Sequence, residues 1–251
     1  MAQQLTALIV GGNGGIGYGF VQQLLSSGQF AQVFATYHRI EQAGPLLSLA
    51  NEYSQLHCLP LDLTHESQIQ GLVAQISGVS DHLDRVINTV GILQQGETLK
   101  PEKSLKHLSS VNLYRYFLTN SIGPILLLKH LLPLCKKSEK PILATLSAKV
   151  GSIGDNHLGG WYGYRASKAA LNMLIRTAAI EYQRVCPQAI VVALHPGTTV
   201  SDLSKPFQGN VPPEKLFPVE RTVCQLLSVI ERLQLSDTGQ FWNWDGGPLP
   251  W

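Results

Sequence analysis

Charged side chains are scarce in this sequence, and neither sign dominates. Only 14% of the 251 residues are Asp, Glu, Lys or Arg, and 19 basic against 17 acidic residues give a formal net charge of +2. Nucleic-acid-binding domains usually carry a strong basic excess, whereas the longest basic run here is the pair Lys136 and Lys137. We therefore expect no nucleic-acid partner. Hydrophobic residues make up 44%, which is typical of a compact protein with broad apolar interfaces, so we expect a homodimer or homotetramer.

Cysteine is also rare, and long apolar runs are lacking. Cys58, Cys135, Cys186 and Cys224 lie far apart with no CxxC spacing, so the sequence indicates neither a zinc site nor a secreted disulfide framework. No cationic segment precedes the first apolar stretch, and no apolar run approaches the roughly 18 residues that span a bilayer. We therefore expect a cytoplasmic protein without a bound metal ion or a membrane partner.

Apolar strand-like runs alternate with helix-length segments along the chain. Six strand candidates lie at residues 5–10, 32–37, 57–61, 85–89, 141–146 and 189–194. Strands rich in Val, Ile and Leu that are separated by helices pair in parallel, because each crossover helix must pack back onto the sheet. The pattern predicts one α/β domain over residues 1–251, with a doubly wound, mainly parallel sheet flanked by helices. A proline-containing stretch, residues 196–218, lacks periodicity, and we expect it to form a substrate loop.

A glycine cluster lies directly between the first strand and the first helix. Gly12, Gly14 and Gly17 fit the pattern GxGxxG, while Gly11, Gly15 and Gly17 fit GxxxGxG. The amides at a helix N-terminus attract phosphate, and glycine lets the backbone approach it closely. A flexible turn without a ligand is the alternative, but the position at this junction favours a bound dinucleotide.

The end of the second strand indicates which dinucleotide is bound. In dinucleotide-binding folds an acidic residue about 20 positions after the turn binds the ribose hydroxyls and favours NAD. This chain has Tyr37, His38 and Arg39 there. Arg39, with His38, can pair with a 2′-phosphate, which a carboxylate would repel. We predict NADP(H) as the cofactor; the alternative is a solvated surface arginine, with Glu41 close enough to alter the local field.

A tyrosine and a lysine begin a later helical stretch at a spacing that places them on one face. Tyr164 and Lys168 are four residues apart. A phenol is a poor acid near neutral pH, and a neighbouring ammonium group lowers its pKa by favouring the phenolate. The tyrosine is therefore a candidate general acid for an oxygen that gains negative charge. The spacing alone is common, so its context decides its weight.

These features together resemble the short-chain dehydrogenase/reductase family, and within it the C-factor-like and small carbonyl-reductase-like branch. The resemblance covers nearly the whole chain. Its motifs, in order, are GxxxGxG at Gly11, Asp62 after the third strand, Asn88-Thr89-Val90-Gly91 after the fourth, Asn120 in TNSIGP, YRASK at Tyr164, and Pro196-Gly197 after the sixth strand.

The resemblance implies a Rossmann-type fold and an NADP(H)-dependent oxidoreductase that interconverts a carbonyl compound and an alcohol. Tyr164 would be the general acid and base, Lys168 would also bind the nicotinamide ribose, and Asn120 would hold a water in a proton relay. Asp62 and Leu63 would lie by the adenine, Asn88 would steady the central strands and the cofactor, and the backbone near Thr199 would meet the carboxamide. The implied cofactor-binding residues are Gly11, Gly15, Ile16, Gly17, His38, Arg39, Asp62, Leu63, Asn88, Tyr164, Lys168, Pro196 and Thr199.

Some of these assignments have structural alternatives. Asp62 can instead cap a helix, and Asn120 can satisfy the local backbone. The family normally has a serine three residues before the glycine that is Gly151 here, but that position holds Ala148, with Ser147 one residue earlier. We expect Ser147 to polarise the substrate carbonyl, although a slip of one residue in a strand reverses the side-chain direction.

A second function belongs to another class. The same fold hosts non-catalytic NADP(H)-binding redox sensors and signalling proteins, and the displaced serine favours that reading. Tyr164, Lys168 and Asn120 oppose it, because a protein that only binds the cofactor has less need of a proton relay. The substrate is not identified by the sequence. The aromatic residues Trp161, Phe207 and Phe217 indicate an apolar pocket.

Overall fold

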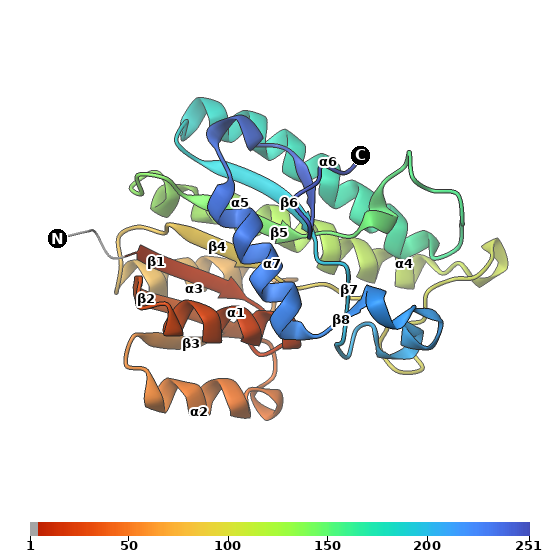
Figure 1. Cartoon of the computed structure of the whole chain (residues 1–251), viewed down its shortest axis with the longest axis horizontal. Coiled ribbons are helices and arrows are strands. Elements are labelled where there is room, and N and C mark those ends of the chain that lie inside the picture. Colours follow the sequence, from red (N-terminus) through yellow and green to blue (C-terminus); the bar gives the residue numbers. More distant parts are fainter. Residues whose placement is uncertain (1–4) are drawn as a thin grey trace.

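The computed structural model describes residues 5–251 of the chain. Figure 1 shows a twisted central sheet with helices on both sides. The sheet has seven strands in the order β3-β2-β1-β4-β5-β6-β9, and all the pairings between them are parallel. The strands are β1 Leu5–Val10, β2 Phe30–Tyr37, β3 Leu56–Pro60, β4 Arg85–Asn88, β5 Ile142–Leu146, β6 Ile190–His195 and β9 Phe241–Asn243. This order confirms the doubly wound fold.

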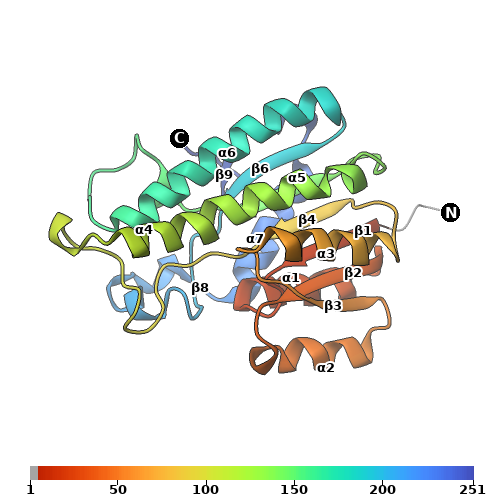
Figure 2. The ribbon, with the colours of Figure 1, turned by 180° about the vertical axis from the view of Figure 1, so that it is seen from behind.

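The helices divide between the two faces of the sheet. One face is covered by α1, α2 and α7, and the other by α3, α4, α5 and α6, as Figures 1 and 2 show from opposite sides. Their bounds are α1 Gly15–Ser26, α2 Gly44–Glu52, α3 Glu66–Ser77, α4 Ser110–Phe117, α5 Gly123–Cys135, α6 Tyr162–Val185 and α7 Val219–Arg232. Each face has its own apolar core, because strands buried on both sides present alternate residues to the two helix layers.

The segment from α4 to α5 is nearly continuous, joined by a π-helical turn at Leu118–Ile122. By length and composition alone, Ser110–Cys135 could cross a membrane. Core helices of soluble proteins pass the same test. In this chain Leu127, Leu128 and Leu131 of α5 are buried in the core, so its apolar character is explained by packing against the sheet.

The stretch 196–218 contains short regular elements as well as loop. β7, Thr198–Thr199, pairs with β8, Leu216–Phe217, and a 3-10 helix spans Lys205–Asn210 between them. The segment therefore returns on itself at the carboxyl end of β6. In a doubly wound sheet ligands bind at this edge, where the strand order reverses.

Candidate active site

The glycine-rich turn is held in a form that only glycine allows. Gly11 has a φ of 84°, and its amide donates to Thr36 Oγ1 at 3.0 Å. A side chain at Gly17 would overlap the carbonyl oxygen of Gly11. Thr89 Oγ1, from the segment after β4, donates to Val10 O at 2.9 Å and ties the turn to the next strand. The turn thus leads directly into the N-terminus of α1, with Gly15 and Ile16 in its first turn.

His38 and Arg39 lie exposed just beyond the end of β2. His38 Nε2 lies 3.4 Å from Asp62 Oδ2, and His65 Nδ1 lies 3.1 Å from the same oxygen. Asp62 Oδ1 accepts hydrogen bonds from the amide and hydroxyl of Thr64, which form a local turn. Asp62 does not cap α3, whose N-cap is His65. Burial opposes ionisation of Asp62, but the Thr64 hydrogen bonds and the two histidines together lower its pKa.

Two further predicted cofactor residues lie on the neighbouring strands and loops. Leu63 is buried, and its carbonyl lies so close to Gly123 that a side chain there would clash. Asn88 is buried at the end of β4, and its Oδ1 accepts from the amide of Val90 at 3.1 Å. Within residues 5–251, Asn88 Nδ2 is a buried donor that has no hydrogen-bond partner. An unpaired buried donor is costly, so this position suits a ligand that accepts from it.

The Pro196-Gly197 turn leads from β6 into β7. Gly197 has a φ of 73°, and a side chain there would strike the ring of Phe217. Thr199 is buried, and its hydroxyl lies 2.8 Å from that of Thr222 at the start of α7. These contacts fix the backbone of Pro196 and Thr199 at the carboxyl end of β6, as a cofactor-binding edge requires.

Tyr164 and Lys168 are both buried on the same side of α6, one turn apart. Lys168 Nζ donates to Leu146 O at 3.0 Å and lies 6.0 Å from the centre of the Tyr164 ring. Within residues 5–251, the Tyr164 hydroxyl has no protein hydrogen-bond partner; a bond from Ser167 Oγ ends on its backbone carbonyl instead. The helix thus presents one tethered ammonium group and one hydroxyl that is free to donate.

Burial shifts the two groups in opposite directions. It lowers the pKa of Lys168 to about 8 and raises the pKa of Tyr164 well above its usual range, because each charged form is poorly solvated there. The expected lowering of the tyrosine pKa by Lys168 is therefore wrong for this structure. The ammonium group is directed at Leu146 O, too far from the phenol to outweigh the burial. A tyrosine that stays protonated at neutral pH suits a proton donor.

Asn120 lies in the π-helical turn and is fully buried. Its Oδ1 accepts from the amide of Ile92 at 2.7 Å, and its Nδ2 donates to Ile92 O at 2.9 Å and Ser167 Oγ at 3.0 Å. A Cβ added at Gly91 would lie 3.3 Å from Lys168 Nζ and 3.5 Å from Asn120 Oδ1. The structure therefore brings Asn120, Lys168 and Gly91 together around one small space. Asn120 thus satisfies the local backbone, as its structural alternative predicts, and its role in holding a water stays a prediction.

Ser147 and Ala148 face opposite ways where the chain leaves β5. The Ser147 hydroxyl is buried and donates to Asn172 Oδ1 at 2.6 Å. Asn172 is eight residues beyond Tyr164, or about 12 Å along the axis of α6. Ala148 instead packs in an apolar cluster with Tyr164. The structure does not bring the Ser147 hydroxyl to the tyrosine.

This cluster, termed here the aromatic pocket wall, surrounds the Tyr164 ring. The centres of the Tyr116 and Trp161 rings lie 6.3 and 6.2 Å from that of Tyr164, and Phe207 of the 196–218 loop lies 4.9 Å from Trp161. Phe217 packs against Trp244 instead. The members of the aromatic pocket wall are Ile92, Leu93, Leu99, Tyr116, Ala148, Val150, Trp161, Tyr164, Leu203 and Phe207.

Glu102 contacts the start of α6 beside Tyr164, and the sequence did not indicate it. It is buried, its Oε2 accepts from the amide of Gly163 at 3.0 Å, and its carbonyl accepts from the amide of Trp161 at 2.5 Å. Trp161 has a φ of 52°, the only positive value at a non-glycine residue among residues 5–251. Glu102 therefore accepts hydrogen bonds from the amide of Gly163, 61 residues away in the first turn of α6, and from that of the N-cap residue Trp161. No local sequence pattern predicts a contact between residues so far apart in the chain.

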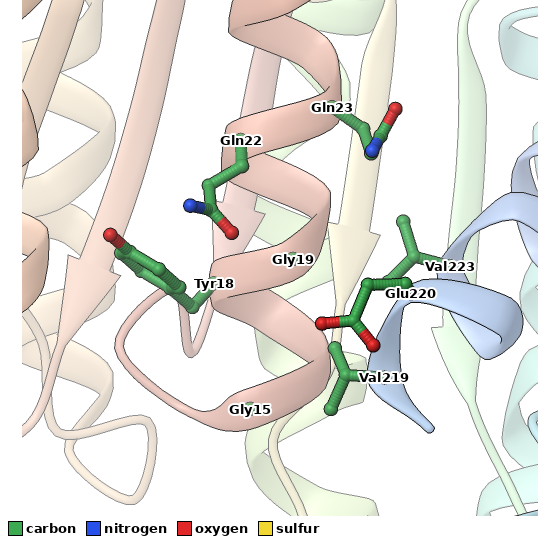
Figure 3. Close-up of a pocket in the computed structure, with 8 residues that line it drawn as sticks. All are labelled: Gly15, Tyr18, Gly19, Gln22, Gln23, Val219, Glu220 and Val223. Atoms are coloured by element: carbon green, nitrogen blue, oxygen red, sulfur yellow. The ribbon is translucent and has the colours of Figure 1, made fainter. Parts of the chain in front are cut away.

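A separate pocket lies between α1 and α7, away from Tyr164. It has a volume of about 280 Å³. Figure 3 shows Gly15 at its base, with Tyr18 and Gln22 on the α1 side and Val219 on the α7 side. It touches the glycine-rich turn through Gly15, but its walls hold none of the residues predicted to move a proton.

Comparison with known proteins agrees with this geometry. The crystal structure of an NADPH-bound carbonyl reductase from chicken fatty liver is 31% identical, with a TM-score of 0.89, over 99% of this chain and 100% of that one. The carbonyl reductase Sniffer of D. melanogaster is 31% identical with a TM-score of 0.88 over the same shares. The C-signal protein of Myxococcus xanthus is 30% identical over 149 residues, 59% of this chain and 84% of its own length. The model of the short chain dehydrogenase family matches residues 5–211, and this chain is an oxidoreductase that belongs to that family.

Proposed function

We propose that the protein is an NADP(H)-dependent oxidoreductase that interconverts a small carbonyl compound, an aldehyde or a ketone, and its alcohol. The observation that carries this proposal is the Tyr164 hydroxyl, which lies in an apolar wall one helical turn from Lys168 and has no protein partner within residues 5–251. The similarity to the chicken carbonyl reductase, which was crystallised with NADPH, supports it.

The residues present fit this cofactor. A side chain at Gly11 or Gly17 would clash with its surroundings, so glycine keeps the turn tight where it leads into the N-terminus of α1, and a pyrophosphate would bind the amides there. His38 and Arg39 are exposed just beyond β2, where they would pair with a 2′-phosphate, and Asp62 and Leu63 would border the adenine. The unpaired Asn88 Nδ2 offers a donor, and the fixed backbone of Pro196 and Thr199 borders the nicotinamide end. When bound, NADPH would supply a hydride to the carbonyl carbon.

Tyr164 would supply the proton in this reaction. As the carbonyl carbon gains the hydride, the π electrons move to oxygen, and the Tyr164 O–H donates its proton to that oxygen. The high pKa of the buried phenol keeps the proton in place until the oxygen becomes basic. The aromatic pocket wall would exclude water from the reacting group.

Lys168 and Asn120 would return the proton to Tyr164. A Lys168 with a pKa near 8 is mostly charged at neutral pH yet can exchange a proton readily. The space beside Gly91, bordered by Lys168 Nζ and Asn120 Oδ1, is the place for a bridging water. One further donor of Lys168 would hold the nicotinamide ribose.

The test is a screen of carbonyl compounds with the purified protein and NADPH. The loss of NADPH absorbance measures turnover of each compound. Reduction of at least one aldehyde or ketone, with NADPH preferred to NADH, is the expected result. Tight NADPH binding without turnover across a broad panel would favour the redox sensor instead. That outcome would remove the catalytic role of Tyr164.

A further inference from the structure

The number of hydroxyl donors around Tyr164 is the starting point. Two residues of the aromatic pocket wall carry a hydroxyl, Tyr116 and Tyr164. The Tyr116 hydroxyl is fully buried and donates to Leu93 O at 2.7 Å. Its hydroxyl hydrogen is therefore already used in a hydrogen bond to the protein backbone. Within residues 5–251, Tyr164 is then the one hydroxyl of this wall with a proton free for a substrate.

The serine beside Ala148 does not add a second donor. Ser147 continues the β5 ladder, with its amide donating to Leu194 O at 2.7 Å, and Ala148 is extended at φ −147° and ψ 140°. Successive side chains of extended backbone point to opposite faces. Since Ala148 packs with Tyr164, Ser147 faces away, and its proton is committed to Asn172 Oδ1.

We propose that Ala148 is a specificity-determining residue, which leaves Tyr164 as the single hydroxyl donor to the substrate oxygen and restricts efficient reduction to electron-poor carbonyl compounds. This inference rests on the proposed carbonyl reduction. Each donor aimed at a developing oxyanion typically changes the rate by about a hundredfold to a thousandfold. With one donor, the substrate itself must carry more of the negative charge, so electron-withdrawing groups beside the carbonyl become necessary. The apolar walls formed by Trp161 and Phe207 favour flat, apolar substrates of this kind.

The experiment compares A148S with wild type on a series of para-substituted benzaldehydes. The introduced serine would place a hydroxyl donor beside Tyr164, so the slope of log kcat/KM against the substituent constant should become shallower. We expect the least electrophilic aldehyde to gain about tenfold and the most electrophilic one to change little. The matched variant is A148C, which adds an atom of similar reach but only a weak donor; its slope should remain that of wild type.

A binding measurement gives a readout that does not depend on turnover. The dissociation constant of benzaldehyde from the protein with NADP⁺ should fall by about fivefold in A148S, as one added hydrogen bond provides. The constant for styrene, which replaces the oxygen by CH₂, should not change. Equal effects on both ligands, or no effect on either, would contradict the proposal.

Three other outcomes separate the inference from the proposed function. If wild type reduces the aldehydes and A148S has the same slope, Ala148 does not set the specificity and the inference is wrong. If S147A or W161F steepens the wild-type slope, a second donor already acts and the inference is equally wrong. If wild type reduces no aldehyde but the binding difference persists, the carbonyl site stands while the proposed reduction fails.

Discussion

The ionisable residues of the site owe their character to burial more than to each other. Lys168 and Tyr164 lie one turn apart, yet the dominant effect on both pKa values is poor solvation of the charged form. The tyrosine thus keeps its proton and the lysine gives its own up more readily. These two pKa values suit a site in which the phenol donates a proton to the substrate and the amine returns a proton to the phenol.

Arg39 should decide the choice between the two nicotinamide cofactors. Wild type should bind NADPH more tightly than NADH, because the exposed guanidinium can pair with the 2′-phosphate. Replacing Arg39→Ala should weaken NADPH binding about tenfold or more, the usual worth of a charge-assisted hydrogen bond, and leave NADH binding unchanged. Fluorescence titration measures both affinities. The exposed Arg184 at the far end of α6 offers the control Arg184→Ala, and an equal loss there would refute a specific role for Arg39.

His195, the last residue of β6, should make the fold sensitive to acid. Burial first, and the charges of Lys149 and Lys168 next, lower its pKa to about 4 against a partly opposing effect of Asp245. The unfolded chain therefore binds a proton below about pH 6.5 that the folded protein takes up only near pH 4, so stability falls as the pH drops through that window.

Replacing His195→Asn should remove much of this dependence. We expect urea unfolding at pH 7 and pH 4.5 to show wild type losing about 2 kcal/mol more than the variant, allowing for the partial exposure of the ring. Parallel losses in the two proteins would mean that His195 does not stay neutral in the fold.

At the scale of elements, the start of α6 depends on a side chain from a distant loop. The Glu102 carboxylate accepts a hydrogen bond from the amide of Gly163, and the Glu102 carbonyl accepts one from the amide of Trp161. Trp161 has a left-handed backbone conformation. Because Tyr164 follows directly, this contact also sets where the phenol lies. A residue held in an unusual backbone conformation needs such support from its surroundings.

Replacing Glu102→Ala should lower the free energy of unfolding by about 1–3 kcal/mol, since the Gly163 amide loses its partner. Glu102→Gln keeps an acceptor oxygen and should retain most of the stability. Urea denaturation measures both, with Glu97→Ala as the control because Glu97 is exposed in the same loop. Equal stability of the three variants would show that the contact contributes nothing.

The sequence predicts strands better than it predicts contacts between them. Runs of Val, Ile and Leu predict six of the strands. The glycine-rich turn, Asp62, Asn88 and Pro196 lie at the ends of these strands. The seventh, β9 at Phe241–Asn243, has three residues and two aromatic side chains, too short to give a pattern. The directions of Ser147 and Ala148 also required the structure, because a single residue of register exchanges their faces. Glu102 was missed since its partners are fixed only by folding.

At the scale of the whole molecule, large apolar side chains on two neighbouring helices, α4 and α6, are exposed. Val111 and Tyr114 of α4 and Met173 of α6 are 66%, 64% and 67% exposed. Figure 2 shows these two helices side by side on one face of the molecule. Of the aromatic residues near the C-terminus, Phe241 lies in the core, while Trp251 is 40% exposed.

We predict that this face forms a homodimer or homotetramer, because solvent contact with so many apolar side chains is unfavourable. Light scattering at micromolar concentration should give at least twice the mass of the chain. Tyr114→Lys should shift the mass toward the monomer, whereas Val79→Lys, on the loop after α3, should not. A strictly monomeric wild type would contradict this prediction.

The central claim is that Tyr164 donates the proton in NADPH-dependent carbonyl reduction, and one kinetic comparison tests it most directly. Tyr164→Phe keeps the ring in the aromatic pocket wall and removes only the hydroxyl, so NADPH affinity should be nearly unchanged while kcat falls about a hundredfold to ten thousandfold. Tyr116→Phe, which removes a hydroxyl bonded to the backbone, should cost far less. Carbonyl reduction by Tyr164→Phe at the wild-type rate would contradict the account.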